Sequence, residues 1–285
     1  MQTTSFYSTA PVASSRDAGD QLGAYLAFLH ARNGSDFARR DQMMAQRFDH
    51  SSVRASILID SERFNRNYAE FTERDVSPEE LALLAFVKIN AGEAYGVEVT
   101  RKARKREWDN DKVLDVLEQV VLHEEDYHTR LLVGAAQHFE GLEINDAWRP
   151  AWPLRLLIGA LSYAPKAMFH PIVLGSEISG VHAFNWLLER IQTLFPDDPK
   201  VRESMEERLI EILIDEVGHV AYNRILVGKM GRSVAGVIAR MVSKSARIMN
   251  KELLALGFDD KTLRGVEGFD YMQLPEEVRR RSFFV

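Results

Sequence analysis

The sequence predicts an all-α protein in which four long helices form a bundle and further helices precede and follow it. Apolar residues recur at the helical spacing of three and four positions through most of the chain, and no stretch alternates as a strand does. Asn33-Gly34 and the run from Pro196 to Pro199 are the clearest breaks. With 285 residues, 46% of them hydrophobic, the chain can bury one large core. We expect a single domain over residues 18–285, with the bundle core at 77–228, and a mobile tail over residues 1–17, which hold little to bury.

The expected helices follow from this periodicity and from the breaks. Amphipathic stretches at 20–31, 36–48 and 53–71 should pack across the outside or one end of the bundle. The first bundle helix should begin at Ser77-Pro78, a serine cap followed by a proline in the first turn, and run to about Lys105. The other bundle helices are expected at about 111–140, 171–195 and 200–228. A short helix at 154–161 and a final amphipathic helix at 234–256 complete the prediction.

Ionisable side chains stand where core residues belong. Glu125 and His128 interrupt a stripe of valines and leucines, and Glu216 and His219 interrupt a second one. Residues three apart lie on one helix face, so each pair can direct a carboxylate and an imidazole at one cation. Glu93 and Glu177 fall on the inward faces of the first and third bundle helices. Because a buried carboxylate costs several kcal/mol without a partner, this pattern indicates a metal site.

The amino-acid composition excludes several kinds of site and partner. The chain has no cysteine, which excludes thiolate metal sites, iron–sulfur clusters and thiol catalysis. The net charge of −6 gives no basic footprint for nucleic acid or an anionic membrane, and we interpret the basic run at 101–106 as a solvated helix end. The beginning of the chain lacks the pattern of a signal peptide, and no apolar run approaches membrane-spanning length. We therefore expect a cytoplasmic protein with no nucleic-acid or membrane partner.

Glu93, Glu125 with His128, Glu177, and Glu216 with His219 give one acid, one Glu-x-x-His pair, one acid and one pair on successive helices. This order resembles the ferritin-like superfamily of di-iron and di-manganese carboxylate proteins. The resemblance covers about residues 77–228 and implies that these six residues bind two iron ions, with manganese as the alternative. Carboxylates with one imidazole per ion suit either metal.

The acid that precedes each Glu-x-x-His pair is a second indication of a metal site. In bundles with this motif, the resemblance implies that the preceding acid holds the outer ring nitrogen of the histidine on the other helix. We accordingly assign Asp215 to His128 and Glu124 to His219, because a ligating imidazole needs its remaining N–H fixed. Tyr127 is either an outer hydrogen-bonding residue of the site or an ordinary core or groove tyrosine.

Within the superfamily, the segments around Glu125 and Glu216 and the chain length look most like the p-aminobenzoate N-oxygenase group. Leu132 stands where radical-generating ribonucleotide reductase subunits have a tyrosine. Ile212 stands where the N-oxygenase group has an additional histidine, so C–H hydroxylation, desaturation and oxidative cleavage remain open beside N-oxygenation. Neither His170 nor His182 is a convincing replacement ligand.

The resemblance implies an oxidoreductase, an O2-activating di-iron monooxygenase that oxidises a small organic substrate with electrons from a reductase or ferredoxin. The alternatives are a fatty-acyl desaturase or hydroxylase, a non-catalytic iron-binding protein, and a dimanganese protein with catalase-like turnover. The long apolar outer helices suggest a homodimer.

The substrate pocket should be lined by residues about one turn from the ligands on the inward faces. Gly96 and Gly180 either make room for a substrate or allow helices to pack closely, and the sequence does not decide between these roles. The complete set of pocket candidates is Ile89, Gly96, Val97, Leu132, Gly180, Val181, Ile212 and Leu213.

Overall fold

The computed structural model describes residues 5–6, 8, 15–50, 52–72, 76–109, 112–144, 149–150, 152–249 and 251–285. Throughout this part of the chain the structure is all-α, and its one β-bridge joins Ser5 to Asp270. The helices are α1 (Ser15–Asn33), α2 (Ala38–Arg47), α3 (Ser61–Ala69), α4 (Pro78–Lys88), α5 (Ala91–Arg104), α6 (Val113–Val133), α7 (Trp152–Ser162), α8 (Lys166–Ile191), α9 (Pro199–Leu226), α10 (Lys229–Met249), α11 (Lys251–Ala255), α12 (Asp260–Gly265) and α13 (Glu276–Arg281).

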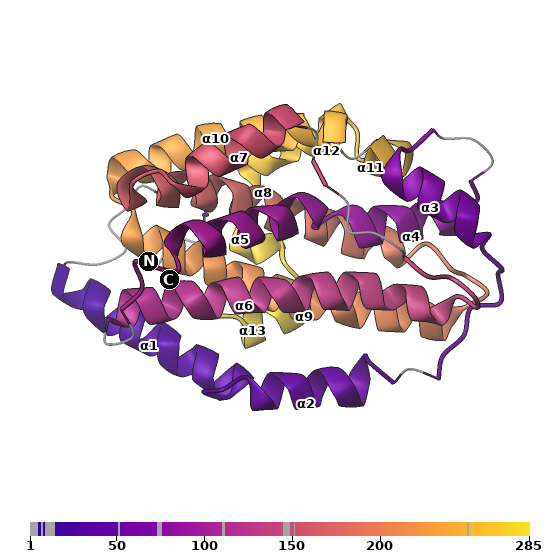
Figure 1. Ribbon diagram of the computed structural model, residues 1–285, viewed down its shortest axis with the longest axis horizontal. Coiled ribbons are helices and arrows are strands. Elements are labelled where there is room, and N and C mark those ends of the chain that lie inside the picture. The colour runs from indigo at the N-terminus through magenta and orange to yellow at the C-terminus, as the bar shows by residue number, and fades with distance from the viewer. Residues whose placement is uncertain are drawn as a thin grey trace.

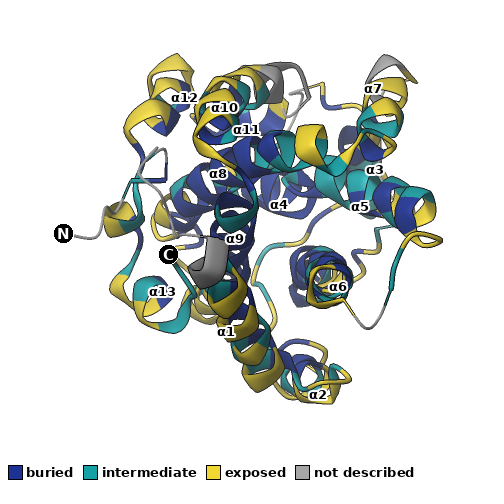
Figure 2. Cartoon of the chain, turned by 90° about the vertical axis from the view of Figure 1, so that its left-hand side faces the viewer, coloured by how far each residue is buried: buried dark blue, intermediate teal, exposed yellow. Residues whose placement is uncertain are grey.

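The centre of the molecule is built from α5, α6, α8 and α9, which run along its long axis (Figure 1). Helix α8 packs against α9 and α10, α5 packs against α6 and α7, and α1 packs against α6 and α9. Figure 2 shows that α8 and α9 are largely buried, whereas α1, α2, α7 and α10 each expose one side. The outer helices therefore cover a central group of four.

Two glycines set how closely the outer helices approach. A Cβ on Gly175 would lie 2.7 Å from the carbonyl oxygen of Ala235, so only glycine lets α10 lie this close to α8. A Cβ on Gly218 would lie 2.9 Å from the hydroxyl of Tyr25, which fixes the contact of α1 with α9. Both glycines precede or follow a proposed ligand by two residues, so these contacts hold the helices that carry the site.

The first bundle helix begins where the sequence predicts. Ser77 caps α4 by accepting a hydrogen bond from the backbone N–H of Glu80 at 3.1 Å, and Pro78 occupies the first turn. The helix does not run unbroken to Lys105, however, because α4 ends at Lys88 and α5 begins at Ala91. Asn90, with φ −95° and ψ 2°, leaves the helical region, as asparagine does more readily than apolar residues. The break lies one turn before Glu93.

Other helix bounds also differ from the prediction. Only Ser61–Ala69 of the stretch 53–71 is helical, because Asp60 caps α3 by accepting a hydrogen bond from Arg63 N–H at 2.7 Å. Helix α6 ends at Val133 and continues as a 3-10 turn to His138. Helix α8 starts at Lys166 and contains Pro171 in its interior, where the missing N–H removes one hydrogen bond of the helix.

The amino-terminal segment contributes to the core at one point. Phe6 is fully buried and its ring packs against Phe269 and Phe284, so the expectation that residues 1–17 hold little to bury is wrong for this residue. Helix α1 already begins at Ser15. Residues 1–4, 7 and 9–14 of the expected tail lie outside the described residues.

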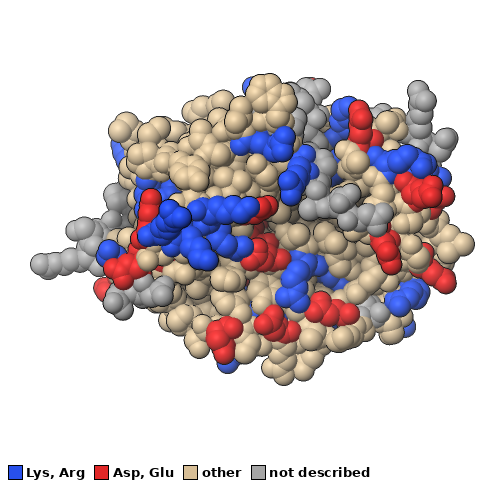
Figure 3. Space-filling model, viewed as in Figure 1, with Lys and Arg blue, Asp and Glu red and all other residues tan. Residues whose placement is uncertain are grey.

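The surface carries both signs of charge. Figure 3 shows a group of basic side chains over the end of α5, next to acidic ones. In this region Arg101 pairs with Asp126 at 2.6 Å and Lys102 pairs with Glu98, which fits a solvated helix end. None of the helices in the described part of the chain combines the length and apolar character needed to cross a bilayer.

Candidate metal centre

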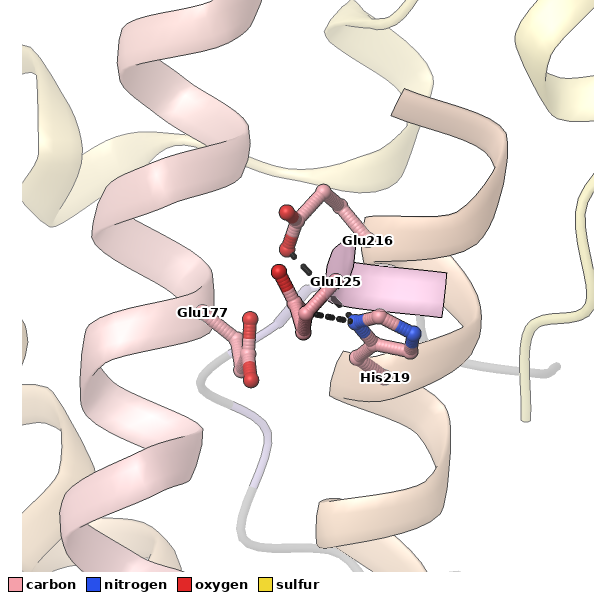
Figure 4. Close-up of side chains that lie close together, drawn as sticks. All are labelled: Glu125, Glu177, Glu216 and His219. Atoms are coloured by element: carbon pink, nitrogen blue, oxygen red, sulfur yellow. Dashed lines mark ion pairs between the residues drawn. The ribbon is translucent and has the colours of Figure 1, made fainter. Parts of the chain in front are cut away.

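Four buried side chains from three helices meet at one point. Glu125 comes from α6, Glu177 from α8, and Glu216 and His219 from α9, and each offers one ligand atom within 4.8 Å of the others. Figure 4 shows the three carboxylates and the imidazole turned toward one another. This group has the residue types and spacing to hold a metal ion.

His128 joins the same cluster from α6. Its Nδ1 lies 3.0 Å from an oxygen of Glu125 and 3.1 Å from an oxygen of Glu216. Its ring centroid is 5.7 Å from that of His219, so the two imidazoles lie side by side. The spacing of three residues in each Glu-x-x-His pair places both members on the inward face of their helix.

Glu93, the sixth predicted ligand, reaches the cluster from α5. It is half-buried and lines the same cavity as Glu125 and Glu177. Burial, and then the negative charges of Glu125 and Glu177, raise the pKa of Glu93 well above its ordinary value. The structure therefore brings all six predicted residues around one centre, with Glu93 on its cavity side.

The cluster fits a cation because several of its buried atoms lack protein partners. Among the described residues, one oxygen of Glu125, one of Glu177 and both of Glu216 accept no hydrogen bond. Nδ1 of His219 lies 2.9 Å from Glu125, but the two atoms are not aligned for a hydrogen bond. Buried polar atoms are rarely left in this state, and metal coordination would satisfy all of them.

The pKa values show the same crowding of negative charge. Burial and the neighbouring Glu216 raise the pKa of Glu177 well above its ordinary value. Burial, Glu93 and Glu125 raise that of Glu216 to about 7. The pKa of Glu125 is lowered to about 2 because the two histidines outweigh the opposing effect of burial. A bound cation would take the place of the protons that these groups otherwise share.

The acid before each Glu-x-x-His pair contacts the histidine of the other helix. Asp215 lies 3.2 Å from Nε2 of His128, and Glu124 lies 3.1 Å from Nε2 of His219. Both pairings are those assigned from the sequence. In each ring, Nε2 is engaged by the outer acid, and Nδ1 is left facing the cluster.

Three residues that the sequence analysis did not identify hold these outer acids. Arg40 from α2 pairs with Asp215 at 2.6 Å, and Arg32 from α1 pairs with it at the same distance. Asn33 donates a hydrogen bond to Glu124 at 2.8 Å. Arg40 could have been identified from the sequence, because it lies one turn before Met44 on the same helix face. A charged residue in line with an apolar one is the pattern that also indicated Glu125.

Tyr127 belongs to the outer side of α6 instead of the cluster. Its hydroxyl donates a hydrogen bond to Asp41 at 2.6 Å, and its ring stacks on Phe37. Arg40 lies over the same ring at 5.3 Å from its centroid. Tyr127 is therefore a groove tyrosine. It contacts Arg40, which in turn pairs with Asp215.

A cavity of about 340 Å³ adjoins the cluster and includes Glu93, Glu125 and Glu177 in its wall. Of the eight pocket candidates, Ile89, Gly96, Val97 and Gly180 line it. Leu132, Val181, Ile212 and Leu213 do not, and all are buried in the core. On α6 the cavity is lined by residues that precede Glu125, and on α9 by residues that follow His219. Leu132, Ile212 and Leu213 therefore lie at the other end of the cluster, and Val181 packs in the core.

The structure also separates the two roles left open for the glycines. A Cβ on Gly96 would meet Ile158 at 3.9 Å, and a Cβ on Gly180 would meet Phe184 at 3.9 Å, which are ordinary contacts. Neither glycine is therefore required for close helix packing. Both line the cavity, where the missing side chains leave space.

Comparisons of the chain with protein-family models, with curated proteins and with solved structures found no match. The chemistry of the site is therefore inferred from its own residues.

Proposed function

We propose that the chain is a ferritin-like bundle formed by α4–α5, α6, α8 and α9, and that its central cluster binds two iron ions. The order of donors supports this assignment, because one acid and one Glu-x-x-His pair alternate along these helices as in di-iron and di-manganese carboxylate bundles. Four carboxylates balance the charge of two divalent ions, which is the condition for burying them together. Manganese is the alternative metal, because the same ligands suit both.

We further propose that the protein is an O2-dependent oxygenase for an organic substrate held in the adjoining cavity. Two bound ferrous ions would supply electrons and open coordination positions for the activation of O2. The observation that carries the proposal is that ligand carboxylates form part of the cavity wall, so that substrate and metals would share one compartment. Electrons for repeated turnover would come from a separate reductase or ferredoxin.

The protein's own residues have three tasks in this reaction. Glu93, Glu125, His128, Glu177, Glu216 and His219 would hold the ions. Asp215 and Glu124 fix the tautomer and orientation of the imidazoles. Apolar residues such as Val97, Ile172 and Val173 line the cavity, keep water out and hold an apolar substrate.

Hydroxylation or desaturation of an apolar chain is favoured over N-oxygenation of an amine. Ile212 is fully buried in the core and lies outside the cavity wall, so no ligand enters from the position where the N-oxygenase group has its additional histidine. His170 is badly placed to replace it, because it lies seven residues before Glu177 on α8, roughly 10 Å along the helix axis. The cavity is also lined mainly by aliphatic and aromatic side chains, as an apolar substrate requires.

Metal analysis tests the cluster. The protein as isolated, or after anaerobic loading with ferrous iron, should contain about two irons per chain, and Glu125→Ala should contain one or none. Glu98→Ala, which removes an exposed carboxylate paired with Lys102, is the matched control and should retain both ions. Equal iron content in Glu125→Ala and the original protein would refute the ligand assignment.

Oxygen consumption tests the function. After anaerobic loading, admission of air should cause uptake of O2 that is faster in the presence of a substrate, with a fixed metal content. Continued accumulation of ferric iron beyond two ions per chain would indicate storage instead. Release of O2 from peroxide by the manganese-loaded protein would indicate catalase-like turnover.

A further inference from the structure

The cavity is elongated and its two ends differ in chemistry. Along α8 its wall extends from Phe169 to Phe184, and Glu177 lies midway. Fifteen residues of helix correspond to roughly 22 Å, at about 1.5 Å per residue. Beyond Glu177 the wall is formed mainly by apolar groups such as Ala183, Leu253 and Phe258, and its two hydroxyls, those of Ser179 and Ser243, bond to each other at 2.8 Å.

The opposite end carries more polar side chains. Thr100 and Ser162 contact each other at 3.1 Å, and the hydroxyl of Ser162 donates to the carbonyl of Ile158 at 2.9 Å. The hydroxyl of Thr100 therefore donates to Ser162, and this pair is satisfied within the protein. The other polar groups at this end are Glu118, His170, Tyr222 and Asn223.

The hydrogen bonds of Asn223 fix the tautomer of His170. The side-chain amide of Asn223 donates from Nδ2 to the carbonyl of His219 at 2.9 Å, so its Oδ1 is the atom that faces Nδ1 of His170 at 3.0 Å. Because Oδ1 can only accept, Nδ1 of His170 carries the proton. Nε2 is then an acceptor, and no described residue donates to it.

The surroundings of His170 favour an uncharged ligand group. Burial lowers the pKa of His170 below its ordinary value, so the ring is neutral at pH 7. Glu118 lies 3.4 Å from Arg104 and 3.1 Å from Lys166, and Asp115 lies 2.8 Å from Lys166. Two acids and two bases thus balance each other. Neither a cation nor an anion would find a net opposite charge here, whereas an O–H or N–H donor would find Nε2.

We propose that Nε2 of His170 binds the polar head of an amphipathic substrate, an uncharged hydroxyl or N–H group, and that the apolar remainder lies past Glu93 and Glu177 toward Phe258. The reaction of such a substrate rests on the proposed oxygenase function, but its binding does not. His170 and Glu177 are seven residues apart on α8, which corresponds to roughly 10 Å along the helix axis. The head would therefore set which part of the chain lies beside the metal ligands.

The test compares two isomers, 1-octanol and 1-methoxyheptane, which have the same atoms but only one of which has a donor. Calorimetric titration uses the metal-free protein, so that binding is measured without turnover. The octanol should bind tighter by roughly 2- to 12-fold, the equivalent of one net hydrogen bond of about 0.5–1.5 kcal/mol. Equal binding of the isomers, or binding of neither, would overturn the proposal.

Variants test whether His170 causes the preference for 1-octanol. His170→Phe should bind both isomers equally, and His170→Gln, which keeps an acceptor, should restore part of the preference. Asn223→Leu should also lose it, because the ring is no longer held with Nε2 unprotonated. Thr100→Val, at the same end of the cavity, is the control and should behave as the original protein does. A preference that survives in His170→Phe and Asn223→Leu, with both variants folded by circular dichroism, would exclude His170 as the acceptor.

The outcomes separate this proposal from the proposed function. A protein that prefers 1-octanol through His170 but binds no iron would have the subsite without being an oxygenase. A protein that binds two irons and consumes O2, but does not distinguish the isomers, would be an oxygenase with a different mode of substrate binding.

Discussion

Replacing Asp215 by asparagine should destabilise the protein strongly while preserving the shape of the side chain. The carboxylate of Asp215 receives Nε of Arg32 at 2.6 Å and Nη2 of Arg40 at 2.6 Å, and it contacts His128 at 3.2 Å. Burial opposes its ionisation, yet the two arginines and His128 hold its pKa well below the ordinary value. Asparagine removes the charge and turns an NH2 group toward a guanidinium group.

The expected loss follows from the burial of the partners. Arg40 is 1% exposed, so it cannot return to water when its carboxylate is neutralised, whereas Arg32, which is 13% exposed, keeps Glu211 at 2.8 Å as a second partner. Removing one partner of a buried ion pair costs about 3–5 kcal/mol, which is a large part of the roughly 5–15 kcal/mol that stabilises a typical protein. Glu98→Gln, which breaks an exposed pair with Lys102, should cost about 1 kcal/mol or less.

Urea unfolding of the metal-free protein, followed by circular dichroism, measures the free energy of unfolding of both variants. Arg40→Met combined with Asp215→Asn should lose less than the sum of the two single losses, because the two groups interact directly. Metal affinity should also fall by roughly 10- to 100-fold, since Asp215 orients His128. A loss of stability below about 1 kcal/mol in Asp215→Asn would refute the inference that Asp215 neutralises the buried Arg40.

Two further predictions concern residues outside the cluster. Burial lowers the pKa of His182 from 6.5 to about 4, so between these values the unfolded chain binds the extra proton and stability falls as the pH falls. Between pH 7 and pH 5 the original protein should lose about 2 kcal/mol more than His182→Gln in urea unfolding, and equal losses would contradict this account. Gly180→Val should change stability little but weaken binding of 1-octanol, because its Cβ enters the cavity with its nearest contact at 3.9 Å. Gly175→Ala should instead lose about 1–3 kcal/mol, since its Cβ would lie 2.7 Å from the backbone of α10, and similar unfolding curves for the two glycine variants would show that this contrast is wrong.

The helices and the six cluster residues could be predicted because their signals are local. An acid or histidine within an apolar helical stripe is visible in one segment of the sequence, and two Glu-x-x-His pairs repeat the signal. The outer acids follow from the same reasoning, since Glu124 and Asp215 each precede a pair. These features need only the helical period and the energetic penalty of burying charge.

The remaining features depend on contacts between distant segments. Nothing near Arg32 or Arg40 in the sequence indicates that both reach Asp215, more than 170 positions away. The position of the cavity on one side of the cluster depends on how α7 packs on α5 and how α10 packs on α8, which is why Leu132 and Ile212 were wrongly expected in its wall. The break at Asn90 reflects a weak local preference that a bundle contact can strengthen or override.

Within the described part of the chain, the buried acids divide into two groups by their partners. Those outside the cluster have a basic side chain, or, for Glu124, the amide of Asn33 and the ring of His219. The ion pairs are Glu80 with Arg63, Asp115 with Lys166, Glu118 with Arg104 and Lys166, Glu211 with Arg32 and Arg281, Asp215 with Arg32 and Arg40, and Glu252 with Lys88.

Glu125, Glu177 and Glu216 differ, because no lysine or arginine that the structure describes pairs with them, and the described bases beside them are two histidines. The chain thus supplies a permanent positive charge wherever a buried acid serves only the fold. It supplies none where three carboxylates converge, although burying them together is the most costly arrangement of all. A bound cation would supply positive charge at that point, which is the strongest physical reason to propose a metal there.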